Sequence, residues 1–262
     1  MGSKNRIAKH ILPIMLKEAE VRGINTWIEP FVGGGNMIDK VPSSYERIGY
    51  DINPHVIMAL IDIRDNIDKL PDSVSEEEYK SYRGLPPQTI TSWVRFVCSF
   101  GGKFDNGYAR EKRSNEKTFV GYGKNNAKKQ QKGFRNDCQE SLDNSLKQYP
   151  KIQKVEFICD TYENLKFKNS LIYCDPPYQN TTSYKTETFN HDKFWDWCRE
   201  MSKDNLVFVS EYNAPSDFNC IWQGEVKTNF ASQRNKPTHN AVEKLFVHNS
   251  TKLSSYKKRT LF

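Results

Sequence analysis

Short apolar segments that alternate with helical segments constrain the fold of this chain more than any other feature. Residues 5–21 have the apolar spacing of an amphipathic helix, Asn53-Pro54 has the cap and proline of a helix start, and residues 191–203 predict a helix between two strands. Short links between such elements are typical of a mostly parallel, doubly wound α/β sheet. The predicted strands are 26–31, 47–51, 154–159, 170–174 and 206–210, with 220–222, 226–230 and 242–247 as an antiparallel edge.

The alternation is lost between residues 80 and 150, where only 89–100 and 138–148 have helical spacing. The part from Lys103 to Arg135 contains ten Lys or Arg and three Asp or Glu, whereas the rest of the chain is balanced, so the whole net charge of +7 lies in this part. Such an excess favours a polyanionic partner, although a solvated charged loop would explain it as well. We therefore expect a main domain, 1–79 with 151–262, that carries a basic insertion, 80–150.

Several classes of protein are disfavoured by the sequence. No apolar run reaches the roughly 18–20 residues that cross a bilayer, and the first residues lack the pattern of a signal peptide. The six cysteines form no Cys-x-x-Cys pair, which favours free thiols over disulfides or zinc. We expect a cytoplasmic protein without a membrane segment.

A glycine-rich turn follows the first predicted strand, in the segment from Glu29 to Asn36. Glycines there let the backbone approach a ligand closely, and Asp51, at the end of the next strand, can accept both hydroxyls of a ribose. This pair favours a nucleoside-containing cofactor, with a plain tight turn as the alternative. The turn is not Gly-x-Gly-x-x-Gly, which disfavours a nicotinamide dinucleotide.

The sequence Asp175-Pro176-Pro177-Tyr178 directly follows the apolar strand 170–174. A carboxylate at the carboxyl end of a central strand projects into the crevice where ligands bind. The two prolines stiffen the turn and donate no N–H, so the turn presents acceptors beside a flat ring. These groups suit the exocyclic amino group of a planar base, whereas the alternative is a rigid turn with a buried tyrosine.

In their order along the chain, these two motifs resemble the S-adenosylmethionine-dependent DNA adenine N6-methyltransferases, and more narrowly the DNA adenine methylase (Dam-like) family of phages and bacteria. Gly2-Ser3-Lys4 is similar to that family's N-terminal Gly-Gly-Lys motif. The resemblance extends from residue 2 to about 247, but 80–150 matches only in position and basic character. It implies a Rossmann-like class I methyltransferase fold, S-adenosylmethionine as cofactor, double-stranded DNA as partner, base flipping, no metal, and a monomer.

The resemblance also implies roles for single residues. Lys4 would contact the cofactor's carboxylate, Asp51 its ribose and Asp160 its adenine. Asp175 and the Pro176 carbonyl would accept the target amine, and Tyr178 would stack on the extruded adenine. The implied cofactor-binding set is Lys4, Glu29, Phe31, Gly33, Gly35, Asp51, Asp160 and Asp175; the catalytic set is Asp175, Pro176, Pro177 and Tyr178; the DNA contacts are Lys103, Arg110, Arg113, Lys124, Lys128 and Arg135.

Two other functions fit the same residues. An RNA adenine N6-methyltransferase would use a similar Asp-Pro-Pro-Tyr turn, and a catalytically silent DNA-binding module would keep the fold alone. Asp in the first place of the turn favours an adenine amine, and the large basic insertion favours a duplex substrate. The recognition sequence and a companion restriction enzyme are not fixed by these residues.

Overall fold

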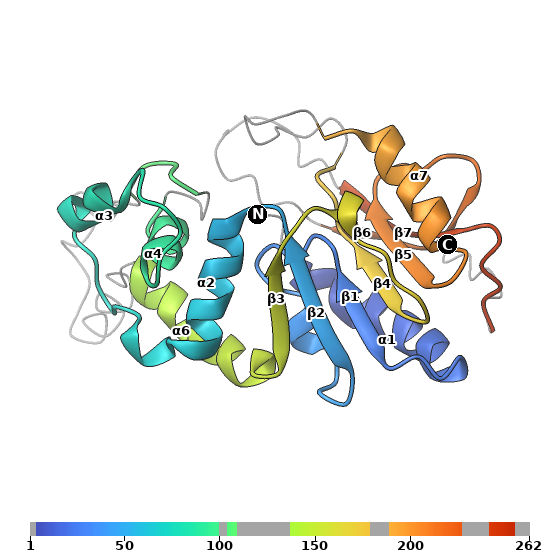
Figure 1. Ribbon diagram of the computed structural model, residues 1–262, viewed down its shortest axis with the longest axis horizontal. Coiled ribbons are helices and arrows are strands. Elements are labelled where there is room, and N and C mark those ends of the chain that lie inside the picture. Colours follow the sequence, from blue (N-terminus) through green and yellow to red (C-terminus); the bar gives the residue numbers. More distant parts are fainter. Residues whose placement is uncertain (1–3, 100–103, 109–136, 179–188, 227–240, 255–262) are drawn as a thin grey trace, which may run out of the picture. The chain divides into compact units, whose positions relative to one another are not determined.

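The computed structural model describes residues 4–99, 104–108, 137–178, 189–226 and 241–254 (Figure 1). The chain forms two compact units. The sheet unit combines the residues up to Ile52 with those from Lys154 onward, and the helical unit is Asn53–Gln153.

The sheet unit contains, in its described residues, a seven-stranded sheet in the order β3-β2-β1-β4-β5-β7-β6. The mostly parallel sheet with an antiparallel edge is therefore as predicted. Neighbouring strands among β1 to β5 pair in parallel, whereas β7 pairs antiparallel with both β5 and β6. The strands are β1 (Thr26–Glu29), β2 (Glu46–Asp51), β3 (Val155–Cys159), β4 (Leu171–Cys174), β5 (Leu206–Glu211), β6 (Phe218–Val226) and β7 (Ala241–His248).

The central strands are buried along their whole length, because both faces of a parallel sheet are covered. Every residue of β4 and β5 is buried. Helix α7 (His191–Met201) packs Phe194 and Trp195 into the same hydrophobic cluster as Val207 and Val209 of β5. Helix α1 (Asn5–Val21), at the bounds that the spacing predicts, buries an apolar stripe and contacts β6.

The order of the strands reverses between β1 and β4. The chain leaves β1 toward β2 on one side, and β4 pairs with β1 on the other side through Ile28 and Ile172. In open α/β sheets, ligands bind outside the carboxyl ends of the strands at such a switch point. Short 3₁₀ turns come after the carboxyl ends of two of these strands: η1 (Ile38–Lys40) after β1 and η6 (Tyr162–Asn164) after β3.

The helical unit contains α2 (Pro54–Asp65), η2 (Ile67–Lys69), α3 (Glu76–Tyr82), α4 (Thr91–Val97) and α6 (Asp137–Ile152). The sequence-based insertion begins at residue 80, whereas this unit begins at Asn53, because α2 packs on α4 and α6. Asn53 caps α2 by accepting from the His55 N–H at 3.0 Å, as its Asn-Pro pattern predicts.

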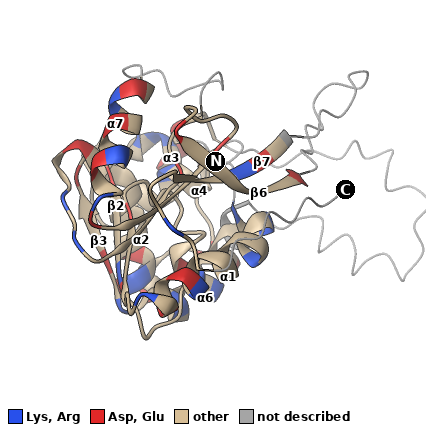
Figure 2. Cartoon of the chain, turned by 90° about the vertical axis from the view of Figure 1, so that its right-hand side faces the viewer, with Lys and Arg blue, Asp and Glu red and all other residues tan. Residues whose placement is uncertain are grey.

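Three predicted elements differ from the observed ones by more than two residues in extent. Strand β6 is continuous where two short strands were expected, with an irregular register between Cys220 and Trp222; residues 227–230 lie outside the described residues. Helix α4 is shorter than the predicted 89–100, and α6 runs beyond the predicted 138–148. Acidic and basic residues are interspersed along α6 and α7 (Figure 2). Most of the basic segment 103–135 lies outside the described residues.

Candidate active site

The glycine-rich turn after β1 is tied to the end of β2 by two hydrogen bonds. The Val32 N–H donates to the Tyr50 carbonyl at 2.8 Å, and the Gly33 N–H donates to Asp51 Oδ2 at 3.1 Å. Gly33 and Gly35 have φ of 49° and 68°, in the left-handed region that favours glycine. The structure thus brings together Gly33 and Asp51, which the sequence places 18 residues apart.

Asp160 lies next to Asp51, at the carboxyl end of the neighbouring strand β3. Its N–H donates to the Asp51 carbonyl at 3.2 Å, and its Oδ1 accepts from the Thr161 N–H at 2.7 Å and from the Asn164 amide at 2.8 Å. These bonds fix the carboxylate at the start of η6. The ends of β2 and β3 therefore present two carboxylates side by side.

Phe31 lies in a cluster of aromatic rings on the same edge of the sheet. Its ring centroid is 5.4 Å from that of Tyr162, 5.8 Å from Phe189 and 5.6 Å from Phe194. Burial raises the pKa of Tyr162 to about 12, so the phenol stays neutral. The sequence does not single out Tyr162, since one tyrosine after a strand carries no pattern of its own.

Glu29, the last residue of β1, is buried in the core and only 2 % exposed. Its Oε1 accepts from the Trp27 indole N–H at 2.9 Å. Burial raises the pKa of Glu29 well above its usual value, against the opposing effect of the Trp27 bond. The structure therefore places Glu29 in the core at the end of β1, directly before the glycine-rich turn.

Four side chains meet at the carboxyl end of β4 and form what we call the carboxylate cluster: Lys4, Asp175, Tyr178 and Glu243. The Lys4 ammonium lies 3.2 Å from Asp175 Oδ1 and 2.9 Å from Glu243 Oε2. Lys4 also donates to the Tyr178 hydroxyl, which in turn donates to Glu243 Oε2 at 2.7 Å. Lys4 and the motif from Asp175 to Tyr178, which the sequence predicts as site residues, are thus in direct contact.

Sequence reasoning missed Glu243. It lies on β7, 239 positions from Lys4, with Val242 and Lys244 as its neighbours in the chain. The sequence predicts this strand at the edge of the sheet, where a charged residue is typical of a face exposed to solvent. The strand order supplies the missing information, since β7 pairs with β5 and β5 pairs with β4.

Burial and charge act on the cluster in opposite directions. Burial raises the pKa of Asp175, Lys4 lowers it, and Glu243 raises it, with a net rise. Burial lowers the pKa of Lys4, but Asp175 and Glu243 outweigh this effect, so the ammonium stays charged. Burial, Asp175 and Glu243 raise the pKa of Tyr178 well above 10, so its phenol stays neutral. The cluster thus combines two acidic side chains with a single basic one.

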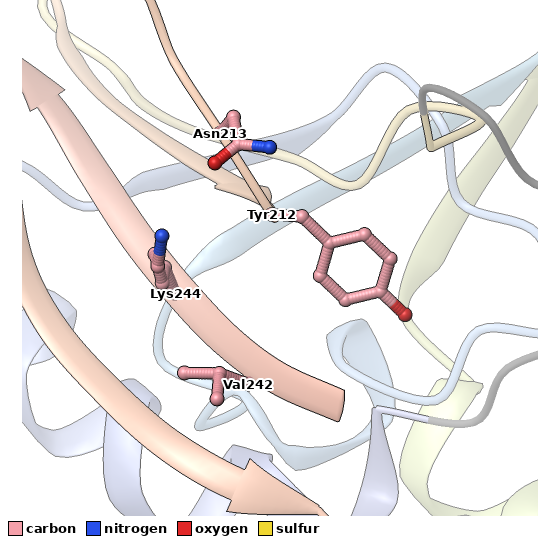
Figure 3. A pocket seen from close by; sticks show the side chains of 4 residues that line it. All are labelled: Tyr212, Asn213, Val242 and Lys244. Atoms are coloured by element: carbon pink, nitrogen blue, oxygen red, sulfur yellow. The ribbon is translucent and has the colours of Figure 1, made fainter. Parts of the chain in front are cut away.

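A pocket of about 380 Å³ is lined by four residues that follow β5 or lie on β7 (Figure 3). Tyr212 and Asn213, which follow β5, line it together with Val242 and Lys244 of β7. The Tyr212 ring meets the Tyr178 ring edge to face, with centroids 4.6 Å apart. The pocket therefore borders the Asp175 motif through a contact between two tyrosines.

The predicted DNA contacts, Lys103, Arg110, Arg113, Lys124, Lys128 and Arg135, lie outside the described residues. Within the described ranges, no helix has the length and apolar character to span a bilayer. The same part of the chain holds no group of three or more His, Cys, Asp or Glu side chains placed for a metal ion.

The strand order, with its antiparallel β6–β7 edge, defines a Rossmann-like methyltransferase fold. The chain belongs to the D12 class N6 adenine-specific DNA methyltransferase family, whose model matches residues 1–87 and 107–237. The resemblance predicted from the sequence is thereby confirmed.

A curated relative supports this assignment. The chain is 23 % identical over 226 residues to the type II methyltransferase M.FokI of Planomicrobium okeanokoites. The match covers 77 % of this chain and 31 % of the relative, so the chain spans about a third of that protein's length.

Proposed function

We propose that this protein transfers a methyl group from S-adenosylmethionine to the N6 amino group of adenine in double-stranded DNA. The observation that carries the proposal is the place of Asp175, at the carboxyl end of β4, beside β1 and its glycine turn. Membership of the D12 class supports the same reaction. We further propose that the protein acts as a monomer in the cytoplasm.

The chemistry of the side chains at this edge fits the donor. Asp51, Asp160 and Asp175 supply acceptors, which suit ribose hydroxyls, an adenine amine and a positively charged sulfur. A pyrophosphate would meet these carboxylates with like charge. In this proposal Asp51 holds the ribose, Asp160 the adenine, and Phe31 lines the pocket. The donor supplies a methyl group on a sulfonium, which is already an activated electrophile.

Asp175 and the Pro176 carbonyl are the proposed acceptors for the adenine amine. Hydrogen bonds to both would favour a pyramidal nitrogen whose lone pair points at the methyl group, with position and orientation supplying much of the acceleration. The nitrogen–carbon bond forms as the carbon–sulfur bond breaks. The surplus amine proton then leaves to solvent, with Asp175 as relay.

Tyr178 is the proposed platform for the adenine that has been rotated out of the duplex. Unstacking costs a few kcal/mol, and stacking on an aromatic ring returns about 1–3 kcal/mol. In this structure the Tyr178 hydroxyl is bonded within the carboxylate cluster, so the ring is held at its polar end.

The insertion, 80–150, is the proposed target-recognition segment. Its basic residues, Lys103, Arg110, Arg113, Lys124, Lys128 and Arg135, would contact phosphates or base edges. Duplex binding should then weaken steeply with salt, because phosphate contacts release counterions. Salt-insensitive binding would contradict this assignment.

The decisive experiment offers the purified protein a labelled methyl donor with duplex DNA of random sequence and with RNA of matched sequence. We expect N6-methyladenine in the DNA, read by mass spectrometry, and sequencing of the modified sites gives the recognition sequence. Methylation of RNA alone would establish the RNA enzyme instead. DNA binding without donor binding, measured by calorimetry, would establish a silent DNA-binding module.

A further inference from the structure

We propose that Glu243 is a positioning residue of the methyl-transfer site, which holds Lys4 and Tyr178 in place beside Asp175. The inference rests on the proposed function, since it deepens the role of the same site. Glu243 lies beyond the residues that the family model matches, which end at 237. Its role therefore has to be argued from the contacts.

A single carboxylate oxygen makes the two contacts that define the cluster. Glu243 Oε2 accepts from the Lys4 ammonium at 2.9 Å and from the Tyr178 hydroxyl at 2.7 Å. Hydrogen bonds to an ionised acceptor are stronger than those between neutral groups. One side chain thus fixes both a residue from the start of the chain and the last residue of the Asp175 motif.

The backbone under Glu243 is well anchored. Strand β7 pairs with β6 on one side, where Glu243 faces Gly224, and with β5 on the other, through Lys244 and Glu211. The Glu243 side chain is only 14 % exposed. A carboxylate on such a strand is a fixed point to which the flexible Lys4 side chain can be tied.

The charges explain why a second carboxylate matters. Paired with Asp175 alone, the Lys4 ammonium would engage the very oxygens that have to accept the target amine. In the structure the ammonium is closer to Glu243, at 2.9 Å, than to Asp175, at 3.2 Å. Glu243 therefore shares the ammonium with Asp175, so that the proposed catalytic carboxylate is not its sole anionic partner.

The first test compares Glu243→Ala and Glu243→Gln with Glu225→Gln, a control on the exposed part of the adjacent strand β6. We expect kcat to fall about a hundredfold in Glu243→Ala and about tenfold in Glu243→Gln, whose amide oxygen still accepts from Tyr178. The KM for DNA should change by less than about threefold. If both Glu243 variants stay within about twofold of the control, the proposal is wrong; if the alanine variant does not fold, the isosteric glutamine variant decides.

The second test is a double-mutant cycle with Tyr178→Phe, which keeps the ring and removes the hydroxyl. If Glu243 acts through Tyr178, Glu243→Ala should lower kcat several-fold less in the Tyr178→Phe background than in the wild type. A loss of the same size in both backgrounds would show that Glu243 does not act through Tyr178, which contradicts the proposal.

The third test needs no methyl transfer. Acetylation of single lysines, followed by mass spectrometry, reports how firmly the Lys4 ammonium is held, with the exposed Lys9 of the same helix as internal control. We expect Glu243→Gln to raise the rate at Lys4 at least about threefold and to leave Lys9 unchanged, because a buried, ion-paired ammonium rarely presents its neutral form. An unchanged rate at Lys4 would overturn the inference, whereas a wild type that methylates no DNA would overturn only the proposed function.

Discussion

Each of the two units contains a carboxylate whose pKa is raised, yet the two carboxylates have different surroundings. Asp62 of the helical unit is fully buried and accepts from neutral donors, the Ile90 N–H at 2.8 Å and the Asn66 amide at 3.3 Å. Asp175 of the sheet unit is 25 % exposed in its side chain and faces the charges of Lys4 and Glu243. In the proposed function only Asp175 reacts, so the two carboxylates are distinguished by the exposure of Asp175 and its ion pair with Lys4 rather than by the raised pKa that they share.

Asp62 has a structural task that its neighbours explain. Ile90 precedes α4 with φ of 70°, which is strained for a β-branched residue. The bond from the Ile90 N–H to Asp62 ties this residue to α2. We expect changes at Asp62 to act on stability, and changes at Asp175 to act on transfer.

The largest expected effect is that of Asp175→Ala. It should lower kcat by about a thousandfold or more, because the amine loses its main acceptor, while the affinity for duplex DNA changes by less than about threefold. Single-turnover methylation and a DNA-binding titration measure the two quantities. If the variant turns over within about tenfold of the wild type, Asp175 is not the catalytic carboxylate and does not differ in role from Asp62.

The next effect in size is on stability. Burial raises the pKa of Asp62 to about 6, from about 3.9 in an unfolded chain. The folded state therefore binds this proton more tightly, and its contribution to stability is full below about pH 4 and is lost as the pH rises through about 6. The difference between these folded and unfolded pKa values corresponds to roughly 3 kcal/mol in the free energy of unfolding.

The variant Asp62→Asn cannot titrate at this position, so it does not share the loss of stability that the wild type undergoes as the pH rises. Its free energy of unfolding should therefore increase relative to that of the wild type by up to about 3 kcal/mol between about pH 4 and pH 7. Urea denaturation at both pH values measures the difference. Methyl transfer at neutral pH should stay within about twofold of the wild type. A constant difference in stability between the two pH values would show that folding does not raise the pKa of Asp62.

A third carboxylate, Asp51 at the end of β2, differs from Asp62 and Asp175 in that its proposed role is to bind the methyl donor. Asp51→Ala should weaken the binding of S-adenosylmethionine by about 2 kcal/mol, or roughly thirtyfold, through the lost hydrogen bonds to the ribose and to the Gly33 N–H. Calorimetry with the donor alone measures this loss. Unchanged donor affinity would refute the assignment of Asp51.

The smallest expected effect concerns Tyr178→Ala. Stacking is worth about 1–3 kcal/mol, so the variant should lose about fivefold more activity on intact duplex than on a substrate whose target adenine is already unpaired. Equal losses on the two substrates would reject a stacking role for the ring. The lost activity would then be attributed to the hydroxyl of Tyr178 and not to its ring.

The local patterns of the sequence predict much of this fold and part of the site. Helix α1 and the sheet follow from periodicity, and Gly33 and Asp51 meet because parallel strands end at one edge. Helix α3 was missed, although Ser75 and Glu78 form a capping box that the sequence contains. Apolar periodicity does not reveal this helix, because it has seven residues and only Tyr79 among them is buried.

Contacts between distant parts of the chain could not be predicted in the same way. Glu243 meets Lys4 only because β7 is inserted between β5 and β6, and spacing along the chain does not encode that order. The assignment of α2 to the helical unit depends likewise on which helices it contacts, since its own apolar stripe fits a sheet equally well.

Because side chains alternate along β7, the charge placed at the carboxylate cluster depends on how β7 is aligned with its neighbouring strands. Glu243 contacts Lys4 in the cluster, whereas its neighbours in the chain, Val242 and Lys244, line the pocket (Figure 3). If β7 slid by a single position against its neighbours, an ammonium would take the place of the carboxylate and repel Lys4. In the proposed mechanism, a substitution that shifts the alignment of β7 would therefore abolish methyl transfer without altering any ionisable group.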